Sequence, residues 1–173
     1  KETNVINLFS TAEEYRQNAA IIIINPKGKV LWCRRKNEKG WQFPQGGIDK
    51  GETPKEAIIR EVYEEVGLKS HDINLLGSIE EWLYYDIPKN KIGKYIPSNF
   101  RGQKQKWFLA ELISSDTKIN LKTTKQVEFD KWEWVTYWHP IAAGVDFKKK
   151  LYRNALTALL PTYFNFIQEK KRR

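Results

Sequence analysis

The chain has 173 residues, a length that suits one compact domain. Apolar residues make up 40% and charged residues 29%, which excludes a disordered tail and a membrane protein. The 30 Lys and Arg residues outnumber the 21 Asp and Glu residues and give a net charge of +9. Such a charge can serve solubility alone, but we expect it to attract a phosphate-rich partner.

The first residues and the cysteine content bear on the cellular compartment. The first 14 residues are polar and acidic, whereas a signal peptide is basic and then apolar. Cys33 is the only cysteine, so an internal disulfide and a zinc site of cysteine pairs are excluded. Both observations lead us to expect a cytoplasmic protein.

The predicted elements begin with strands. Residues 1–17 are predicted as irregular. Two β-rich runs, 18–24 and 30–35, are joined by Asn25-Pro26-Lys27-Gly28, whose Pro and Gly suit a turn. These runs therefore predict a β-hairpin. A further extended run over 41–45 ends at a pair of glycines.

The helix predicted over 54–66 has the clearest signals in the chain. Thr53 suits the N-cap, Pro54 suits the first helical position, and Glu56 completes a capping box. Four apolar residues between 57 and 66 recur at helical spacing and form one stripe. Gly67 tolerates the left-handed conformation that ends many helices.

The second half of the chain mixes strands with a helix. Three apolar runs predict strands: 73–85 (one or two strands), 107–113 and 132–135. The basic stretch 86–103 predicts a long loop, and loops of that length often form lids or binding loops. From residue 146 the pattern is helical, and Pro161 is expected to interrupt or kink that helix.

This order of elements predicts the fold class. The succession β–β–β–α–β–β–α is typical of a mixed β-sheet with helices, an α/β (α+β) architecture, and excludes a helical bundle or a β-sandwich. We expect three parts along the chain: an N-terminal arm over 1–14, a folded domain over 15–160, and a basic helical tail over 161–173.

Acidic residues gather on the predicted helix of this otherwise basic protein. Glu61, Glu64 and Glu65 stand at i, i+3 and i+4, so their carboxylates are neighbours that repel one another. Such a group alone is ordinarily a solvated helix face. Here a glycine pair precedes it, which lets the backbone approach the helix. Carboxylate and backbone oxygens are the ligands that Mg²⁺ and Mn²⁺ prefer, so the segment predicts a site for one or more of these ions.

The whole segment has a fixed spacing that carries further information. It is written Gly46-x5-Glu52-x7-Arg60-Glu61-Val62-x-Glu64-Glu65-x-Gly67-Leu68. The chain here resembles the Nudix hydrolase family, whose 23-residue signature it matches at every fixed position. The resemblance implies the Nudix α/β/α sandwich, with 15–160 as the Nudix domain. It also implies Mg²⁺-dependent hydrolysis of a nucleoside diphosphate linked to another moiety.

Further blocks resemble one group of that family, the bacterial RNA pyrophosphohydrolases. They are Tyr15-Arg16-x-Asn18, Trp41-Gln42-Phe43-Pro44-Gln45-Gly46-Gly47, Gly102-Gln103-Lys104-Gln105-Lys106-Trp107-Phe108, Glu128-Phe129-Asp130-x-Trp132 and Val145-x-Phe147-Lys148. This group implies removal of pyrophosphate from the 5′-triphosphate end of RNA, which leaves a monophosphate and initiates mRNA decay. Metal ions suit that reaction, because they neutralise the phosphoanhydride and lower the pKa of a bound water.

The resemblance also implies roles for the acidic residues. Glu61 and Glu65 are the expected principal metal ligands, and Glu64 is a ligand or the group that activates water. Gly46 supplies a backbone oxygen. Glu128 adds a carboxylate from a distant loop, as ligand or base, with an exposed loop residue as the alternative.

Two residues of the signature are expected to support these ligands. Arg60 holds the carboxylates in place through its positive charge. Glu52 either binds the metal through water or pairs with Arg60. The sequence leaves both roles of Glu52 open.

Four residues are expected to contact the substrate. Arg16 and Lys148 are transferred from the resemblance as phosphate contacts, and Arg35 and Phe147 as a clamp for an RNA base. A guanidinium and an aromatic ring can both stack on a base. The alternatives left open are a core aromatic for Phe147 and a solvated strand residue for Arg35.

Two other functions are compatible with the sequence. A dinucleoside polyphosphate hydrolase, acting for example on diadenosine tetraphosphate, would use the same metal site, although the net charge and the basic loop favour RNA. A non-catalytic Nudix-fold binding module would be expected to lose signature acids, and all are present. We expect 5′-triphosphorylated RNA or a nucleoside polyphosphate as partner, no DNA, no membrane, and a monomer.

Overall fold

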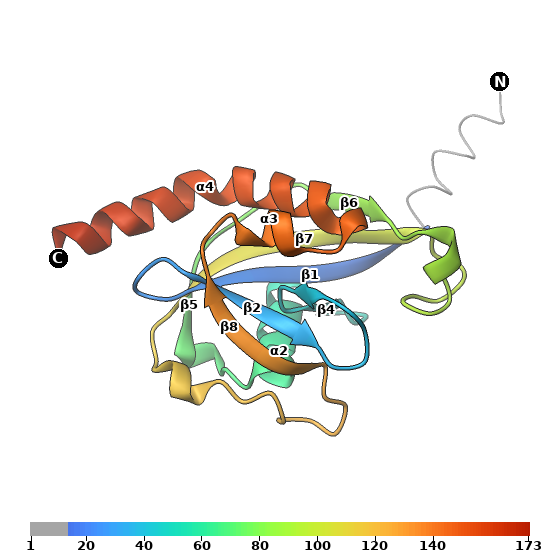
Figure 1. Cartoon of the computed structure of the whole chain (residues 1–173), viewed down its shortest axis with the longest axis horizontal. Coiled ribbons are helices and arrows are strands. Elements are labelled where there is room, and N and C mark those ends of the chain that lie inside the picture. Colours follow the sequence, from blue (N-terminus) through green and yellow to red (C-terminus); the bar gives the residue numbers. More distant parts are fainter. Residues whose placement is uncertain (1–13) are drawn as a thin grey trace.

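The computed structural model describes residues 14–173, so the predicted arm lies outside the described residues except for its last one. Within this range the chain forms one sheet with helices on both faces (Figure 1). The strands are β1 (Tyr15–Ile24), β2 (Val30–Arg35), β3 (Trp41–Gln42), β4 (Gln45–Gly47), β5 (Ile73–Ser78), β6 (Leu83–Asp86), β7 (Gly102–Leu112) and β8 (Phe129–Val135). The α-helices are α2 (Pro54–Val66), α3 (His139–Ala143) and α4 (Lys149–Arg172).

The sheet is mixed, and β1 runs through its middle. β1 pairs antiparallel with β2 and β4 on one side and parallel with β7 on the other. β5 and β6 pair antiparallel with β7, and β8 pairs antiparallel with β2. Because α2 covers one face and α4 the other (Figure 1), the predicted α/β architecture with a mixed sheet is confirmed.

The core has two layers because side chains alternate along β1. Ala20, Ile22 and Ile24 face α4, while Ala19, Ile21 and Ile23 face α2. The α4 layer is built around Phe43, whose ring meets the rings of Trp32, Trp107 and Tyr152 edge-on at centroid distances of 5.0–5.6 Å. Burial on both faces explains the continuous apolar run of β1.

Helix α2 has the predicted bounds and the predicted caps. The Thr53 hydroxyl accepts from the Glu56 N–H, and the Glu56 carboxylate accepts from the Thr53 N–H, both at 3.2 Å. Gly67 ends the helix with φ of 76°, in the left-handed region. The capping box fixes where the helix begins, and therefore which of its residues reach the sheet.

Several boundaries differ from the prediction. β1 begins at Tyr15 rather than residue 18, because its first residues pair with β7 from Gly102 onward. β7 likewise begins at Gly102 rather than 107. α3 was not predicted. No helix among residues 14–173 has the length and apolar character that crossing a bilayer requires.

Helix α4 is continuous through Pro161, so of the predicted interruption or kink the interruption is wrong. Proline removes one N–H and leaves the carbonyl four residues earlier, that of Thr157, without its helical partner. Both Pro161 and Thr157 are exposed, so water can satisfy that carbonyl. The apolar stripe of the helix continues past the proline to Phe166, which packs in the α4 layer of the core.

Replacing Phe166 tests whether 161–173 is a separate tail. The ring is 6% exposed, so Phe166→Ala should lower the free energy of unfolding by about 3–5 kcal/mol. Phe164 is 56% exposed, so Phe164→Ala should change the free energy of unfolding by less than about 0.5 kcal/mol. Chemical denaturation measures both. Equal, small effects would support the predicted boundary at residue 161.

Candidate active site

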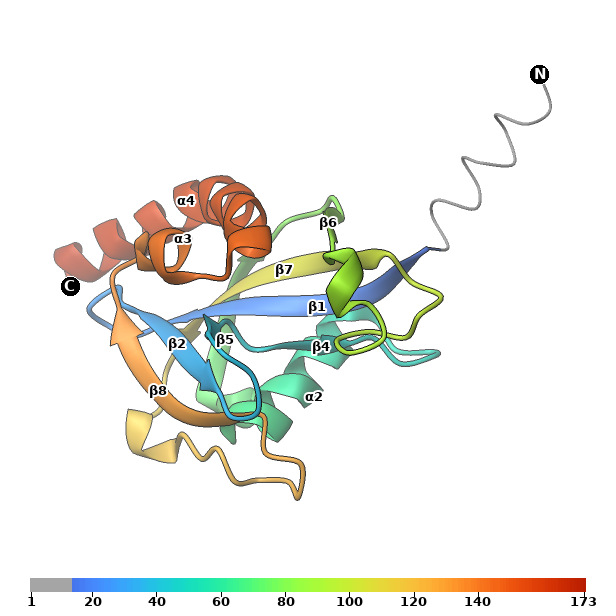
Figure 2. The same cartoon turned by 45° about the vertical axis from the view of Figure 1, so that its right-hand side comes forward.

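A cleft of about 920 Å³ lies where β1, β4 and the C-terminal half of α2 meet. The loop between β6 and β7 projects at the same end of the sheet (Figure 2). All predicted catalytic and substrate-binding residues line this one cleft, although they come from six parts of the chain: Arg16, Arg35, Gly46, Glu61, Glu64, Glu65, Glu128, Phe147 and Lys148.

Glu65 is the most buried carboxylate of the cleft. It is 5% exposed, and its Oε1 accepts a hydrogen bond from the Gln45 N–H at 2.9 Å. Burial, with the charge of Glu61 as the next cause, raises its pKa well above the usual range. Burial also raises the pKa of Glu61. Burial therefore disfavours the charged form of both carboxylates, a cost that a bound cation would offset.

Arg60 gathers the acidic residues at the rim of the cleft. Its Nε and Nη2 donate to the Glu52 carboxylate at 2.7 and 2.9 Å, and its Nη1 donates to Glu61 at 2.7 Å and Glu64 at 3.3 Å. The hydrogen bonds from Arg60 lower the pKa of Glu52 to about 2. The sequence left two roles open for Glu52, binding metal through water or pairing with Arg60. In this structure Glu52 pairs with Arg60.

Gly46 is needed because the Glu61 carboxylate lies directly against its backbone. A Cβ at Gly46 would lie 2.0 Å from the Glu61 Cδ, far inside van der Waals contact. A Cβ at Gly47 would lie 2.5 Å from the Arg16 Nη2. The two glycines therefore let a carboxylate and a guanidinium approach β4 closely.

The donor set suits a hard divalent cation. Among residues 14–173, no three His, Cys, Asp or Glu side chains are arranged to hold an ion as they stand, and Glu61 and Glu64 are held by Arg60. Even so, four carboxylates and the Gly46 backbone line one cleft, and two of the carboxylates have raised pKa values. These groups fit Mg²⁺ or Mn²⁺ once Glu61 and Glu64 turn from Arg60.

The cleft also contains a buried lysine. Lys148 is 5% exposed, and its Nζ lies 3.3 Å from the Gln42 Oε1. Burial lowers its pKa to about 7, and the charge of Arg35 contributes in the same direction. A phosphate in the cleft would supply the counter-charge that Lys148 lacks.

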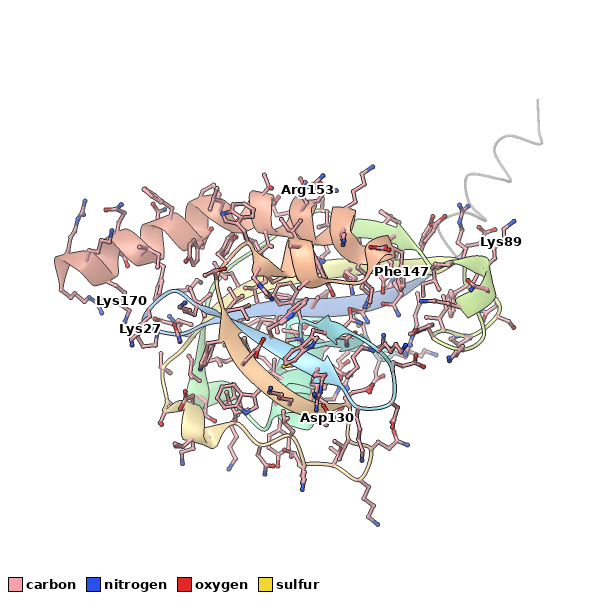
Figure 3. All side chains as sticks on the ribbon, in the orientation of Figure 1. Lys27, Lys89, Asp130, Phe147, Arg153 and Lys170 are labelled. Carbon is pink, nitrogen blue, oxygen red and sulfur yellow. The ribbon has the colours of Figure 1, made fainter. Side chains whose placement is uncertain are left out.

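Phe147, immediately before α4 (Figure 3), belongs to both the cleft and the core. Its half-buried ring lies nearly parallel to the Tyr85 ring, at 6.2 Å and 27°. The Arg35 guanidinium lies over the ring of Tyr95, with Cζ 4.9 Å from the centroid. The proposed clamp residues thus share the cleft, with Tyr95 as a neighbour of both.

The profile of the NUDIX domain matches residues 14–155. The chain belongs to the Nudix family. Its fold agrees with solved Nudix structures at low identity. The chain is similar to the Escherichia coli dihydroneopterin triphosphate pyrophosphohydrolase (TM-score 0.63, 19% identity) and to a Caenorhabditis elegans Ap4A hydrolase (TM-score 0.60, 23% identity), in each case over 83% of this chain and 98% of the other.

This Nudix chain also has nearer relatives by sequence. It is 48% identical to the RNA pyrophosphohydrolase of Hydrogenovibrio crunogenus over 148 residues, which cover 86% of this chain and 90% of the relative. It is 49% identical to the RNA pyrophosphohydrolase of Francisella philomiragia over 143 residues, 83% of this chain and 92% of the relative. Nudix hydrolases generally use divalent metal ions.

The sequence did not single out four polar and aromatic residues of this Nudix cleft. They are Gln42, Tyr85, Tyr95 and Gln103, and the Tyr85 hydroxyl donates to the Gln103 Oε1 at 2.9 Å. Two of them stand within blocks that carried the family resemblance. Only the unusual length of the basic loop indicated that a residue such as Tyr95 could reach the site.

The burial of Lys148 makes a pH-dependent prediction. Below pH 7 the folded protein holds a buried ammonium, whereas between pH 7 and 10.5 the folded state loses that proton and the unfolded state keeps it. The cost of burial is therefore fully present below pH 7 and is relieved as the pH rises. Lys148→Met should raise the free energy of unfolding at pH 6 by about 1–2 kcal/mol, and by less at pH 10.

Denaturant titrations of both proteins without substrate, at pH 6 and pH 10, measure this difference. Lys149→Met is the matched control, because Lys149 is exposed to solvent and pairs with Asp146 at 3.2 Å. A gain that is the same at both pH values would show that Lys148 stays charged in the folded protein.

Proposed function

We propose that this Nudix protein is an RNA pyrophosphohydrolase that removes pyrophosphate from the 5′-triphosphate end of RNA. The product is a 5′-monophosphate, and the reaction initiates mRNA decay. The observation that carries the proposal is that one cleft contains four carboxylates together with cations and aromatic rings. A triphosphate and a base need these two environments side by side. The relatives at 48% and 49% identity support the same function.

The proposed cofactor is Mg²⁺ or Mn²⁺, in more than one copy. Glu61, Glu64, Glu65 and Glu128 would hold the ions, with a backbone oxygen from Gly46. Bound there, the metal would neutralise the phosphoanhydride and lower the pKa of the attacking water. The raised pKa values of Glu61 and Glu65 support this assignment, because burial disfavours their charged forms and a bound cation would offset that cost.

The other side chains bind and orient the substrate in this proposal. Arg16 lies against Gly47 beside the carboxylates, and Lys148 lies deeper, beside Gln42. Both bring positive charge to phosphate oxygens. Glu64 and Glu128 are the carboxylates that can accept a proton from the attacking water. Arg60 keeps the acidic residues in position through four hydrogen bonds to their carboxylates, and it donates a fifth to the Gly47 carbonyl.

The proposed substrate is a polyanion that carries at least one nucleobase. A net charge of +9 favours RNA over a compact dinucleoside polyphosphate, since charge attraction grows with the number of phosphates. We propose action in the cytoplasm as a monomer, in keeping with the single buried Cys33. No DNA contact is part of the proposal.

The deciding experiment compares triphosphorylated RNA with diadenosine tetraphosphate at equal enzyme concentration. We expect a kcat/KM at least about tenfold higher on RNA, a difference of about 1.4 kcal/mol. Exhaustive chelation with EDTA should stop the reaction, and added Mg²⁺ should restore it. A preference for diadenosine tetraphosphate would make that compound the substrate. Cleavage of neither would leave a binding module.

Phe147→Ala should separate the two substrates further. Loss of one stacked ring costs about 1–3 kcal/mol, so we expect KM for RNA to rise about tenfold or more. The effect on diadenosine tetraphosphate should be smaller. Trp138→Ala, at an exposed aromatic outside the cleft, is the control. Equal losses on both substrates would contradict a clamp for an RNA base.

A further inference from the structure

Tyr95 reaches the cleft from the loop between β6 and β7, and the proposed function gives it no role. Its hydroxyl donates to the Glu38 Oε2 at 2.9 Å, which fixes the outer end of the ring. One face receives the Arg35 guanidinium, with Cζ 4.9 Å from the ring centroid. The Phe147 ring lies 6.4 Å away at an angle of 69°. The Tyr95 ring is therefore held on three sides.

A second cation completes this arrangement. The Lys91 Nζ lies 5.5 Å from the Tyr95 centroid and 5.2 Å from the Phe147 centroid, so it lies over both rings. We call Arg35, Lys91, Tyr95 and Phe147 the base box. Its members come from β2, from the loop between β6 and β7, and from the segment before α4. Rings combined with cations are the groups that bind unpaired bases.

Tyr95 packs against the core on one side and reaches the cleft on the other. A ring that only fills the core is enclosed, whereas Tyr95 is half-buried and lines the cleft together with Arg35 and Phe147. Contacts to Glu38 and Arg35 orient the ring before any ligand arrives. A ring held in advance loses little freedom on binding, so more of its stacking energy contributes to affinity.

We propose that Tyr95 contacts a nucleobase near the 5′ end of RNA and forms the third wall of the base box, beside Arg35 and Phe147. This inference rests on the proposed function, because it names a base-binding residue of the same cleft.

The test removes the Tyr95 ring from the protein and, separately, single nucleobases from the RNA. Four triphosphorylated oligonucleotides are compared, one intact and three that each lack the base at position 1, 2 or 3. Tyr95→Ala should raise KM on intact RNA about tenfold, which corresponds to about 1.4 kcal/mol of lost stacking. On one of the three abasic substrates the same substitution should have no further effect. An equal rise on all four substrates, or no rise on any, would overturn the proposal.

Three variants separate contact from positioning and from misfolding. Tyr95→Phe keeps the ring but loses the hydrogen bond to Glu38, so its KM should lie between those of the wild type and Tyr95→Ala. If Tyr95 acts solely by holding Arg35, Tyr95→Ala will add nothing to Arg35→Ala. We expect a further rise in KM in the double variant, and its absence would overturn direct contact. Tyr84→Ala, at an exposed tyrosine of β6 outside the cleft, should leave the kinetic constants unchanged.

The proposed function can fail independently of this inference. If the wild type cleaves none of the oligonucleotides, the proposed function is wrong. Binding of a 5′-monophosphorylated oligonucleotide then tests whether Tyr95 contacts a nucleobase. Fluorescence anisotropy should show about tenfold weaker binding for Tyr95→Ala than for the wild type. Unchanged binding would overturn the contact.

Discussion

Glu61→Gln should lower kcat by about 10³-fold, a loss of about 4 kcal/mol of transition-state stabilisation. The amide keeps the size of the side chain but removes the charge that would bind a divalent cation. Stability should be preserved, because burial already raises the pKa of Glu61 and disfavours its charged form in the fold. Single-turnover rates at saturating Mg²⁺ measure the loss, and thermal unfolding checks the fold.

Glu56→Gln is the matched control for this prediction. Glu56 lies on the same helix and undergoes the same chemical change, but it caps the helix outside the cleft. Gln also serves in a capping box, so activity and stability should both be retained. Near-normal turnover of Glu61→Gln at saturating Mg²⁺ would remove Glu61 from the catalytic residues.

Gly46→Ala should lower activity about 10²-fold with little change in stability. The new Cβ would occupy the place of the Glu61 carboxylate, 2.0 Å from its Cδ. A flexible side chain can swing away at small cost to the fold, but the carboxylate then leaves β4 and the cleft. Misplacement of a catalytic group by about 1 Å can cost about 10²-fold in rate.

Gly77→Ala provides the comparison. Gly77 lies on β5, away from the cleft. A Cβ at this position would lie 3.1 Å from the Thr162 side chain. Activity should stay within about twofold, and any cost should appear in the free energy of unfolding. If Gly46→Ala were as active as Gly77→Ala, Glu61 would not need its place against β4.

Features encoded locally were predictable from the sequence. The bounds of α2 follow from a capping box and a left-handed glycine, and all of these signals lie within 15 consecutive residues. Adjacent carboxylates also require a positively charged group nearby. Arg60, which lies on the same turn of α2, is that group. Local chemistry of this kind does not depend on the rest of the fold.

Features that depend on distant contacts were not predictable in the same way. The first three residues of β1 have no local strand signal and are extended because β7 pairs with them. The position of Tyr95 in the cleft depends on how the loop between β6 and β7 folds back toward Arg35. Pro161 was expected to interrupt or kink α4, but the helix is continuous, and Phe166 beyond the proline packs in the core.

The parallel pairing of β1 with β7 has a consequence for synthesis on the ribosome. β1 ends at Ile24, and its partner is complete only at Leu112, so one side of β1 stays unpaired for several seconds at about 5–20 residues per second. That side belongs to an apolar strand, and an open apolar edge is where nascent chains aggregate. Contacts between residues so far apart in sequence also slow folding. The centre of the sheet is therefore open to self-association during translation until β7 has been made.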